Sequence, residues 1–553
     1  MPNPQPTSLA STDRDARLWT LLLLSSLAYF FSVHQADNDL WGHLFAGREI
    51  LARGGVPRVD AYSYTVAGGA WFNHEWLTHV LFAELYGAAG SAGLLLYKMV
   101  AALAAFGLTF AGIRRRSAQP WIWGSVGLLT IAVLARGFAI RPQVFSYAAI
   151  ALVLDLLDRY QHGSLRLLWL LAPLFVLWAN VHGGFVLGLA IVAGFTGWQL
   201  LMGFPLLRPT PDAHRPSSLR TLLAVFASCL GAAMLTPYGS KLLGYLWDEL
   251  SRSHPITEWQ PASPWQSEHS AFFLMFAVFV ASLLLGWRRG AVNGHALTLP
   301  QAQGERGNTY DDTRSTAREG RAAVEQPHWR DDGWRVVLSL GVGLFAIRHQ
   351  RHIPVFALCA AVPLTAQLEA LAHRLDERRY QLLSDAALTM VRAGLVLLAL
   401  FQLTLTGLRL WRDGLQVTFD PSEYPVAAVA ALKAGAAHGN LAVPLDWGAY
   451  VLWHLAPQIK PSIDGRFATV FPESVVEDNF AFYRGDDRWR RLIDNYPTEA
   501  VLAPRDWQLP IEHAPGWHKV YEDSVATLFV REDHIGDFGI RLGNSTTPTG
   551  FFP

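Results

Sequence analysis

Long apolar runs recur along the first 410 residues of this chain, separated by short polar segments that carry arginine. An α-helix needs about 20 apolar residues to cross the hydrocarbon core of a bilayer. We expect about eleven such helices, at 18–34, 91–113, 121–135, 143–157, 165–180, 183–204, 219–236, 271–287, 334–347, 353–372 and 390–410. The sequence therefore predicts an α-helical polytopic membrane protein.

The composition agrees with this class. Only 16% of the residues are charged, whereas about 25% is usual in a soluble protein. The formal net charge is zero, so nothing in the charge balance points to nucleic acid. The two cysteines, Cys229 and Cys359, both lie in apolar runs. Neither can form a disulfide within the polar C-terminal part, which we therefore expect to stand on its own core.

The distribution of lysine and arginine predicts the orientation. With the N-terminus in the cytoplasm, the inside segments hold 22 of these residues and the outside loops hold nine. Because inside loops of membrane proteins are enriched in lysine and arginine, this arrangement is favoured. We expect a multi-pass protein of the cell inner membrane, in contact with membrane lipids, with a cytoplasmic N-terminus and a periplasmic C-terminal domain.

Two domains follow from the change in composition near residue 410. Residues 1–410 form the transmembrane domain, and residues 411–553 are predicted to be a periplasmic α/β domain because helix-like and strand-like patterns alternate there. Within the transmembrane domain, residues 35–90 form the first periplasmic loop. Residues 290–333 have almost no apolar content and predict a disordered cytoplasmic loop.

The first periplasmic loop carries the most informative pattern. Apolar residues at helical spacing predict two amphipathic helices on the membrane surface, one from about residue 40 to 51 and one from about 73 to 81. Asp39/His43 and Glu75/His79 are both i, i+4 pairs, so each pair falls on one helical face. The loop therefore presents acids and histidines at the membrane interface.

Three interpretations of these residues compete. They can simply cap and solvate interfacial helices. A zinc protease is excluded, because His74 and His79 are five positions apart and a second ligand at i+5 is rotated about 100° past the i+4 position. In the third interpretation, Asp37 or Asp39 acts as a general base on an acceptor hydroxyl or holds a divalent metal.

Cations gather at the predicted outer ends of the helices. They are Arg136, Arg141, His182, Arg348, Arg351 and His352. Any single one can reach lipid headgroups, but several on one side suit a phosphate. The acids would supply a base and the cations would stabilise a lipid-phosphate leaving group. That division of labour fits sugar transfer from a polyprenyl-phosphate donor.

Four short motifs carry a family resemblance: 37–43 (Asp-Asn-Asp-Leu-Trp-Gly-His), 74–77 (His-Glu-Trp-Leu), 446–450 (Asp-Trp-Gly-Ala-Tyr) and 463–466 (Ile-Asp-Gly-Arg). With them, the chain resembles the C-class integral-membrane glycosyltransferases (GT-C), which include protein O-mannosyltransferases, the lipid A aminoarabinose transferase and oligosaccharyltransferases. More closely, it looks like a bacterial group of membrane proteins with these motifs.

The resemblance implies roles for individual residues. It makes Asp37 or Asp39 the catalytic carboxylate or a ligand of Mg²⁺ or Mn²⁺. Because Asn38 separates acids that are adjacent in the mannosyltransferases, which aspartate acts stays open. Glu75 is a further catalytic candidate. The substrate-binding candidates are His43, His74, His79 and the six cations at the outer helix ends.

We therefore expect a glycosyltransferase that moves a sugar from a polyprenyl-phosphate donor to a hydroxyl of a lipid, glycan or protein acceptor. An O-antigen ligase or polymerase also uses such donors, but its long outside loop falls late in the chain. A transporter predicts polar residues at mid-membrane, whereas here they collect at one face. An envelope scaffold remains open as well.

Overall fold

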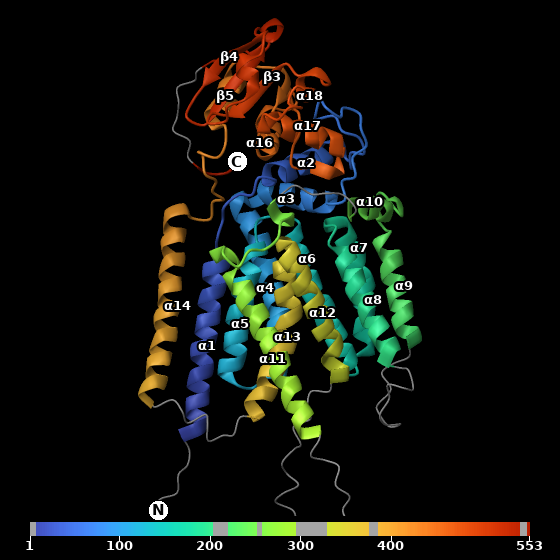
Figure 1. The fold of residues 1–553 in the computed structure, drawn as a ribbon, viewed down its shortest axis with the longest axis vertical. Helices are drawn as coiled ribbons and strands as arrows, with labels where there is room; N and C mark the ends of the chain where they lie inside the picture. The colour runs from blue at the N-terminus through green and yellow to red at the C-terminus, as the bar shows by residue number, and fades with distance from the viewer. Residues whose placement is uncertain (1–6, 203–218, 251–256, 295–328, 375–384, 542–549) are drawn as a thin grey trace, which may run out of the picture.

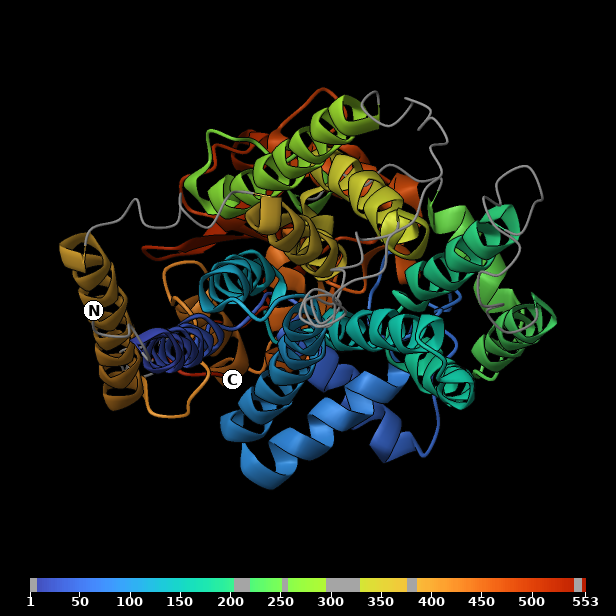
Figure 2. The ribbon, with the colours of Figure 1, turned by 90° about the horizontal axis from the view of Figure 1, so that it is seen from below.

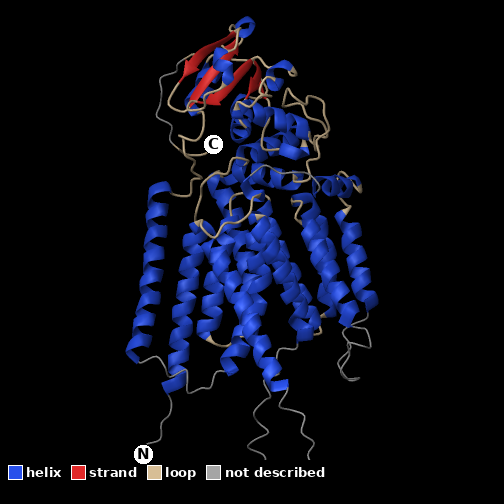
Figure 3. Cartoon of the chain, viewed as in Figure 1, coloured by secondary structure: helices blue, strands red, loops and turns tan. Residues whose placement is uncertain are grey.

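The computed structural model describes residues 7–202, 219–250, 257–294, 329–374, 385–541 and 550–553. A bundle of long helices carries a smaller domain at one end, and two short helices lie across the bundle between them (Figure 1). The strands lie in the smaller domain (Figure 3). We call this domain, from residue 411 onward, the outer domain.

Each predicted span coincides with a helix of the bundle. These helices are α1 (Thr7–Phe31), α4 (Ser91–Arg116), α5 (Pro120–Leu134), α6 (Gln143–Gln161), α7 (Leu171–Val181), α8 (Phe185–Met202), α9 (Leu219–Ala233), α11 (Ser270–Gly294), α12 (Trp329–Arg348), α13 (Ile353–Arg374) and α14 (Asp385–Asp413). Seen along the bundle, α14 lies at one edge beside α1, and α8 and α9 form another edge (Figure 2).

Six helices among the described residues are long and apolar enough to cross a membrane. They are α4, α5 with its 3-10 extension, α8, α11, α13 and α14. Of the others, α7 and α9 are short, and α6 and α12 carry several charged residues. Multi-pass membrane insertion is thus supported, and a count of eleven spans stays a prediction.

Both predicted helices of the first loop are present. They are α2 (Leu40–Arg53) and α3 (Trp76–Ala89). Gly54 ends α2 in the left-handed region (φ 67°), where its N–H donates to the Ile50 carbonyl. The two helices cross in backbone contact at Gly47, where an added Cβ would overlap the His79 carbonyl. This close crossing fixes the positions of their polar ends.

The outer domain is an α/β domain, as predicted. Its helices are α15 (Val426–Ala434), α16 (Leu445–Leu455), α17 (Glu473–Arg484) and α18 (Arg491–Asp494). Its strands are β1 (Gly439–Ala442), β2 (Ile459–Pro461), β3 (Ala500–Pro504), β4 (Trp517–Glu522) and β5 (Ala526–Arg531), in the order β2-β1-β3-β5-β4. β1 pairs in parallel with β2 and β3, whereas β5 is antiparallel to β3 and β4.

The outer domain shares part of its core with the first loop, in addition to an apolar cluster formed by outer-domain residues alone. Trp41 of α2 is fully buried among the rings of Phe419, Tyr424, Tyr450 and Phe552. One apolar cluster joins both ends of the chain in this way. Burying such an aromatic side chain contributes about 1.5–3 kcal/mol, so the first loop is part of the outer domain's stability.

The predicted cytoplasmic loop 290–333 is shorter than expected at both ends. α11 extends to Gly294 and α12 begins at Trp329, so the flanks of the segment are helical. Residues 295–328 lie outside the described residues.

Candidate active site

Two aspartates at the start of α2 face a partly buried arginine. Asp39 is the N-cap residue of α2, and its N–H donates to Asp37 Oδ1 at 3.1 Å. Arg141 lies just before α6. Its Nε is 2.6 Å from Asp37 Oδ1, and its Nη2 is 3.3 Å from Asp39 Oδ2. The structure thus joins a predicted acid pair to a predicted cation.

A third acid, Glu258, also pairs with Arg141. It lies in the 3-10 helix η4 (Thr257–Trp259), in the loop that connects α10 (Lys241–Leu250) to α11. Three carboxylates therefore surround one guanidinium, which holds the pKa of Arg141 above its usual range. The three carboxylates outnumber the one guanidinium, so this group can accept a proton or bind a cation.

The carboxyl of Asp39 is held near neutrality. Burial beneath the outer domain raises the pKa of Asp39 to about 7, against the opposing effect of Arg141; Asp37, Glu258 and Glu75 raise it further. Its side chain is 32% exposed, so the group still reaches solvent. An acid whose pKa lies near the working pH suits general acid–base catalysis. This favours Asp39 over Asp37 as the base.

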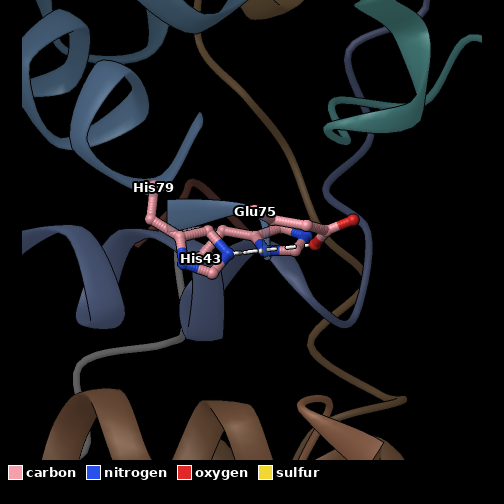
Figure 4. A group of neighbouring side chains, drawn as sticks. All are labelled: His43, Glu75 and His79. Carbon is pink, nitrogen blue, oxygen red and sulfur yellow. Dashed lines mark hydrogen bonds and ion pairs between the residues drawn. The ribbon is translucent and has the colours of Figure 1, made fainter. Parts of the chain in front are cut away.

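A second group of side chains surrounds Glu75, the N-cap residue of α3. His43 Nδ1 and His79 Nε2 are 3.0 Å apart, and His79 Nε2 is 3.9 Å from Glu75 Oε2 (Figure 4). The other oxygen, Oε1, lies 3.7 Å from His182 Nε2 and 3.8 Å from His74 Nε2. Four predicted histidines thus meet one predicted acid.

The groups around Glu75 are shifted toward their neutral forms. Burial raises the pKa of Glu75 to about 7, while Arg351 and Arg141 oppose this shift. Burial also lowers the pKa of His43 to about 3 and lowers that of His79 far below its ordinary value. Both imidazoles are therefore neutral at pH 7 and can accept a proton or bind a metal ion.

The contacts of His182 determine its tautomer. The Gly184 N–H donates to His182 Nδ1 at 2.9 Å, so this nitrogen is an acceptor. The Ser146 hydroxyl lies 2.7 Å from the same nitrogen and itself accepts from Trp178 Nε1–H. The proton of the neutral ring is therefore on Nε2, which faces Glu75.

One predicted pair does not form as expected. The i, i+4 spacing predicts that His43 and Asp39 share one face of α2. The ring of His43 contacts His79 and Phe82. The Asp39 carboxyl pairs instead with Arg141, whose Nη2 is 3.3 Å from Asp39 Oδ2.

The outer domain reaches the site through its 463–466 motif. Gly465 lies against Asp39 so tightly that an added Cβ would overlap Asp39 Oδ1. The next residue, Arg466, is buried and pairs with Asp60 of the first loop at 2.6 Å and with Asp464 at 2.7 Å. This ion pair network fixes the backbone of Gly465 beside the acid.

Some of the predicted cations lie near the acids of the site, and the others make contacts elsewhere. The ring of Trp259 lies 4.6 Å from the Arg351 guanidinium, whose charge acts on Glu75. Arg136 pairs with Glu268 at 2.8 Å, and His352 packs on Phe345. Arg348 is exposed at the end of α12. The structure brings Arg141, His182 and Arg351 to the acids, and it places Arg136, Arg348 and His352 in other contacts.

An apolar groove of about 700 Å³ opens beside the Glu75 group. Its lining residues come from α3, α7 and the segment after α9: Trp76, Leu77, Pro173, Val176, Leu177, Asn180, Leu235, Thr236 and Pro237. Trp76 Nε1–H donates to Asn180 Oδ1 at 2.8 Å. Trp76 directly follows Glu75 in the chain, and the residues that line the groove are all uncharged.

Sequence reasoning missed three residues of the site. Glu258 lies in a loop without periodicity, and nothing in the sequence places it beside Arg141. Ser146 is a lone hydroxyl within an apolar helix. Asp60 follows Pro57 in the first loop, where an aspartate is typical of a turn and does not indicate an ion pair. The 463–466 motif was the one signal that pointed to its partner, Arg466.

Comparison with known proteins identifies the fold. No family model matches the sequence, and no curated protein matches it either. The structure is similar to the oligosaccharyltransferase AglB from Archaeoglobus fulgidus, solved with an inhibitory peptide and a dolichol-phosphate. The TM-score is 0.52 with 10% identity, over 90% of this chain and 70% of AglB.

ArnT from Cupriavidus metallidurans also matches, with a TM-score of 0.49 and 12% identity over 94% of this chain and 98% of ArnT. Because the sequence identity is this low, the similarity to AglB shows a shared fold and nothing further. The chain has the fold of the GT-C glycosyltransferases, as its sequence resemblance implied.

Proposed function

We propose that this chain is a membrane glycosyltransferase that moves a sugar from a polyprenyl-phosphate donor to an acceptor hydroxyl at the outer-domain end of the bundle. The observation that carries the proposal is the position of Asp39 in a GT-C fold. It is a partly solvated carboxyl with a pKa of about 7, held between Arg141 and the outer domain.

In the proposed reaction Asp39 accepts the proton of the acceptor hydroxyl. The hydroxyl oxygen then forms a bond to the anomeric carbon of the sugar, and the bond from that carbon to the phosphate oxygen breaks. The products are the glycosylated acceptor and the polyprenyl phosphate. Arg351, which lies within electrostatic reach of Glu75, would stabilise the phosphate charge.

The groove beside α3 and α7 supports a lipid-linked donor. Its lining is mostly apolar and includes Trp76, which follows Glu75 in the chain. A polyprenyl chain in this groove would bring its phosphate to the cations. AglB, whose fold this chain shares, was solved with a dolichol-phosphate, which is a ligand of the same chemical class.

A Mg²⁺ or Mn²⁺ ion on Asp37 and Asp39 fits this arrangement poorly. Both carboxylates direct oxygens at the Arg141 guanidinium, 2.6 and 3.3 Å away. The position between the two carboxylates that a metal ion would take is therefore occupied by the Arg141 side chain.

The proposal includes the orientation that the arginine distribution predicts. The site would face the periplasm from the inner membrane, where polyprenyl-linked donors replace nucleotide sugars. The acceptor would be a lipid, glycan or protein hydroxyl.

The test is transfer of a labelled sugar from a polyprenyl-phosphate donor by the purified chain in proteoliposomes. Asp39→Asn keeps the size of the side chain and removes proton acceptance, so the rate should fall about 10²–10⁴-fold. Glu84→Gln is the matched control, because Glu84 is an exposed acid of α3 outside the site. It should leave the rate unchanged.

Full transfer by the Asp37→Asn, Asp39→Asn double variant would refute the catalytic assignment. No transfer by the wild-type chain with any polyprenyl-phosphate donor would refute the proposed function and favour an envelope scaffold or a transporter.

A further inference from the structure

The group around Glu75 contains a set of donor atoms that the proposed reaction does not use. One ligand atom each from His43, Glu75 and His79 lie within 4.8 Å of one another. They come from two helices, α2 and α3, whose backbones touch at Gly47. Figure 4 shows the two imidazole rings and the carboxylate converging.

The chemistry of the donors selects the kind of ion. Two neutral imidazole nitrogens and one carboxylate oxygen are ligands that Zn²⁺ takes in proteins. Mg²⁺ and Ca²⁺ prefer sites made of oxygen ligands. We propose that His43 Nδ1, His79 Nε2 and Glu75 Oε2 bind one Zn²⁺ ion, which joins α2 to α3 and leaves a fourth position for an oxygen ligand.

The spacing allows such an ion after an inward movement of the Glu75 carboxylate. Zinc lies about 2.0–2.1 Å from histidine nitrogens, so tetrahedral ligand atoms are about 3.3 Å apart. The two nitrogens are now 3.0 Å apart, and His79 Nε2 is 3.9 Å from Glu75 Oε2. The rings would separate by about 0.3 Å, while the carboxylate would move inward by about 0.6 Å toward His79 and by up to about 1.5 Å toward His43, since the ligand atoms lie as much as 4.8 Å apart.

The surroundings hold the ligands as metal sites commonly do. Glu75 Oε1, the oxygen left over, faces the protonated Nε2 of His182 at 3.7 Å. The orientation of that ring is fixed by the Gly184 N–H and by Ser146. Outer contacts of this kind orient a ligand and strengthen metal binding. His182 is therefore a positioning residue for the zinc site.

The inference does not depend on glycosyl transfer, so its test measures zinc directly. The full chain is purified in detergent, freed of any histidine tag, stripped with a chelator, reloaded with Zn²⁺ and desalted. Metal analysis should then give one zinc per chain. Co²⁺ loading should give the intense visible absorption of a tetrahedral site.

Matched variants locate the site. Glu75→Gln keeps the shape of the side chain and should weaken zinc binding at least about ten-fold, and the His43→Ala, His79→Ala double variant should abolish it. His182→Ala should weaken binding about 10–100-fold. His438→Ala removes a histidine that is 64% exposed in the outer domain, and this variant should bind zinc like the wild type.

Thermal unfolding gives a second readout, since zinc should raise the Tm of the wild type and not that of the double variant. If the double variant does not fold, the wild-type stoichiometry and the Glu75→Gln titration still decide. The inference would be overturned if the wild type holds no zinc after loading, or if Glu75→Gln binds zinc with wild-type affinity. His43 and His79 would then be only a hydrogen-bonded pair.

Discussion

The two ends of the helix bundle both contain buried charges, but the charges are arranged differently. At the end away from the outer domain lies an inner charge network, formed by Arg115, Arg116, Arg335, Asp155, Asp158 and Asp332. Its ion pairs are 2.6–3.2 Å long, and Asp158 alone contacts three arginines.

At the outer end, the acids outnumber their cations. Arg141 serves three carboxylates, and the contacts of Glu75 with histidines are 3.7–3.9 Å long. Paired charges hold helices together, whereas buried acids whose pKa values are raised toward neutrality, as at Asp39 and Glu75, are typical of functional sites. The comparison therefore assigns stability to one end and chemistry to the other.

The largest effect should come from breaking the inner network. Asp158→Leu leaves Arg335, which is 2% exposed, without its ion partner. Removing one member of a buried ion pair typically costs about 3–5 kcal/mol. Denaturant titration in detergent should show this loss of stability, while transfer per folded molecule stays at the wild-type rate.

Arg159→Gln is the control at that end, because the side chain is 45% exposed and pairs with Asp155 at the rim of the network. Its cost should be at most about 1 kcal/mol. Wild-type stability of Asp158→Leu would contradict the structural role of the network.

A smaller effect should follow from Gly465→Ala at the outer end. The new methyl group would displace the Asp39 carboxyl, and misplacing a catalytic group by about 1 Å can cost about 10²-fold in rate. The transfer assay measures the loss. Gly536→Ala, where an added Cβ meets open space, should be silent. Equal rates for both variants would show that the outer domain does not position Asp39.

The smallest effect is a displaced pH profile. Asp39 accepts a proton only when ionised, so kcat/KM should rise as pH increases through about 7. Arg141 lowers the pKa of Asp39, so Arg141→Gln should raise that pKa and move the acid limb to higher pH. Arg53→Gln on α2 is the control, since Arg53 pairs with Glu49. An unmoved limb in Arg141→Gln would mean that another group is titrated.

Much of the fold could be predicted because hydropathy is a local signal. Each apolar run became a helix, and the spacing around Leu40 and Leu44 predicted α2. The alternating patterns after residue 410 predicted the α/β class of the outer domain. The shared core around Trp41 was missed, because its ring partners follow 378 (419 − 41) to 511 (552 − 41) residues later.

The members of the site could be predicted better than their pairing. Asp39, Glu75 and Arg141 were identified as chemically unusual residues at one membrane face. Their partners depend on tertiary packing: Arg141 joins Asp37 and Asp39 through the turn before α6, and Glu258 comes from a loop without pattern. His43 turned toward His79 because α2 and α3 cross at Gly47.

The ion pair between Asp60 and Arg466 also sets an order of events during synthesis. Asp60 leaves the ribosome 406 residues before Arg466, since 466 minus 60 is 406. At about 5–20 residues per second, the first loop waits roughly 20–80 s for its partner. The ring partners of Trp41, from Phe419 to Phe552, are likewise made long after Trp41 itself. The site can therefore be completed only after the outer domain has been synthesised.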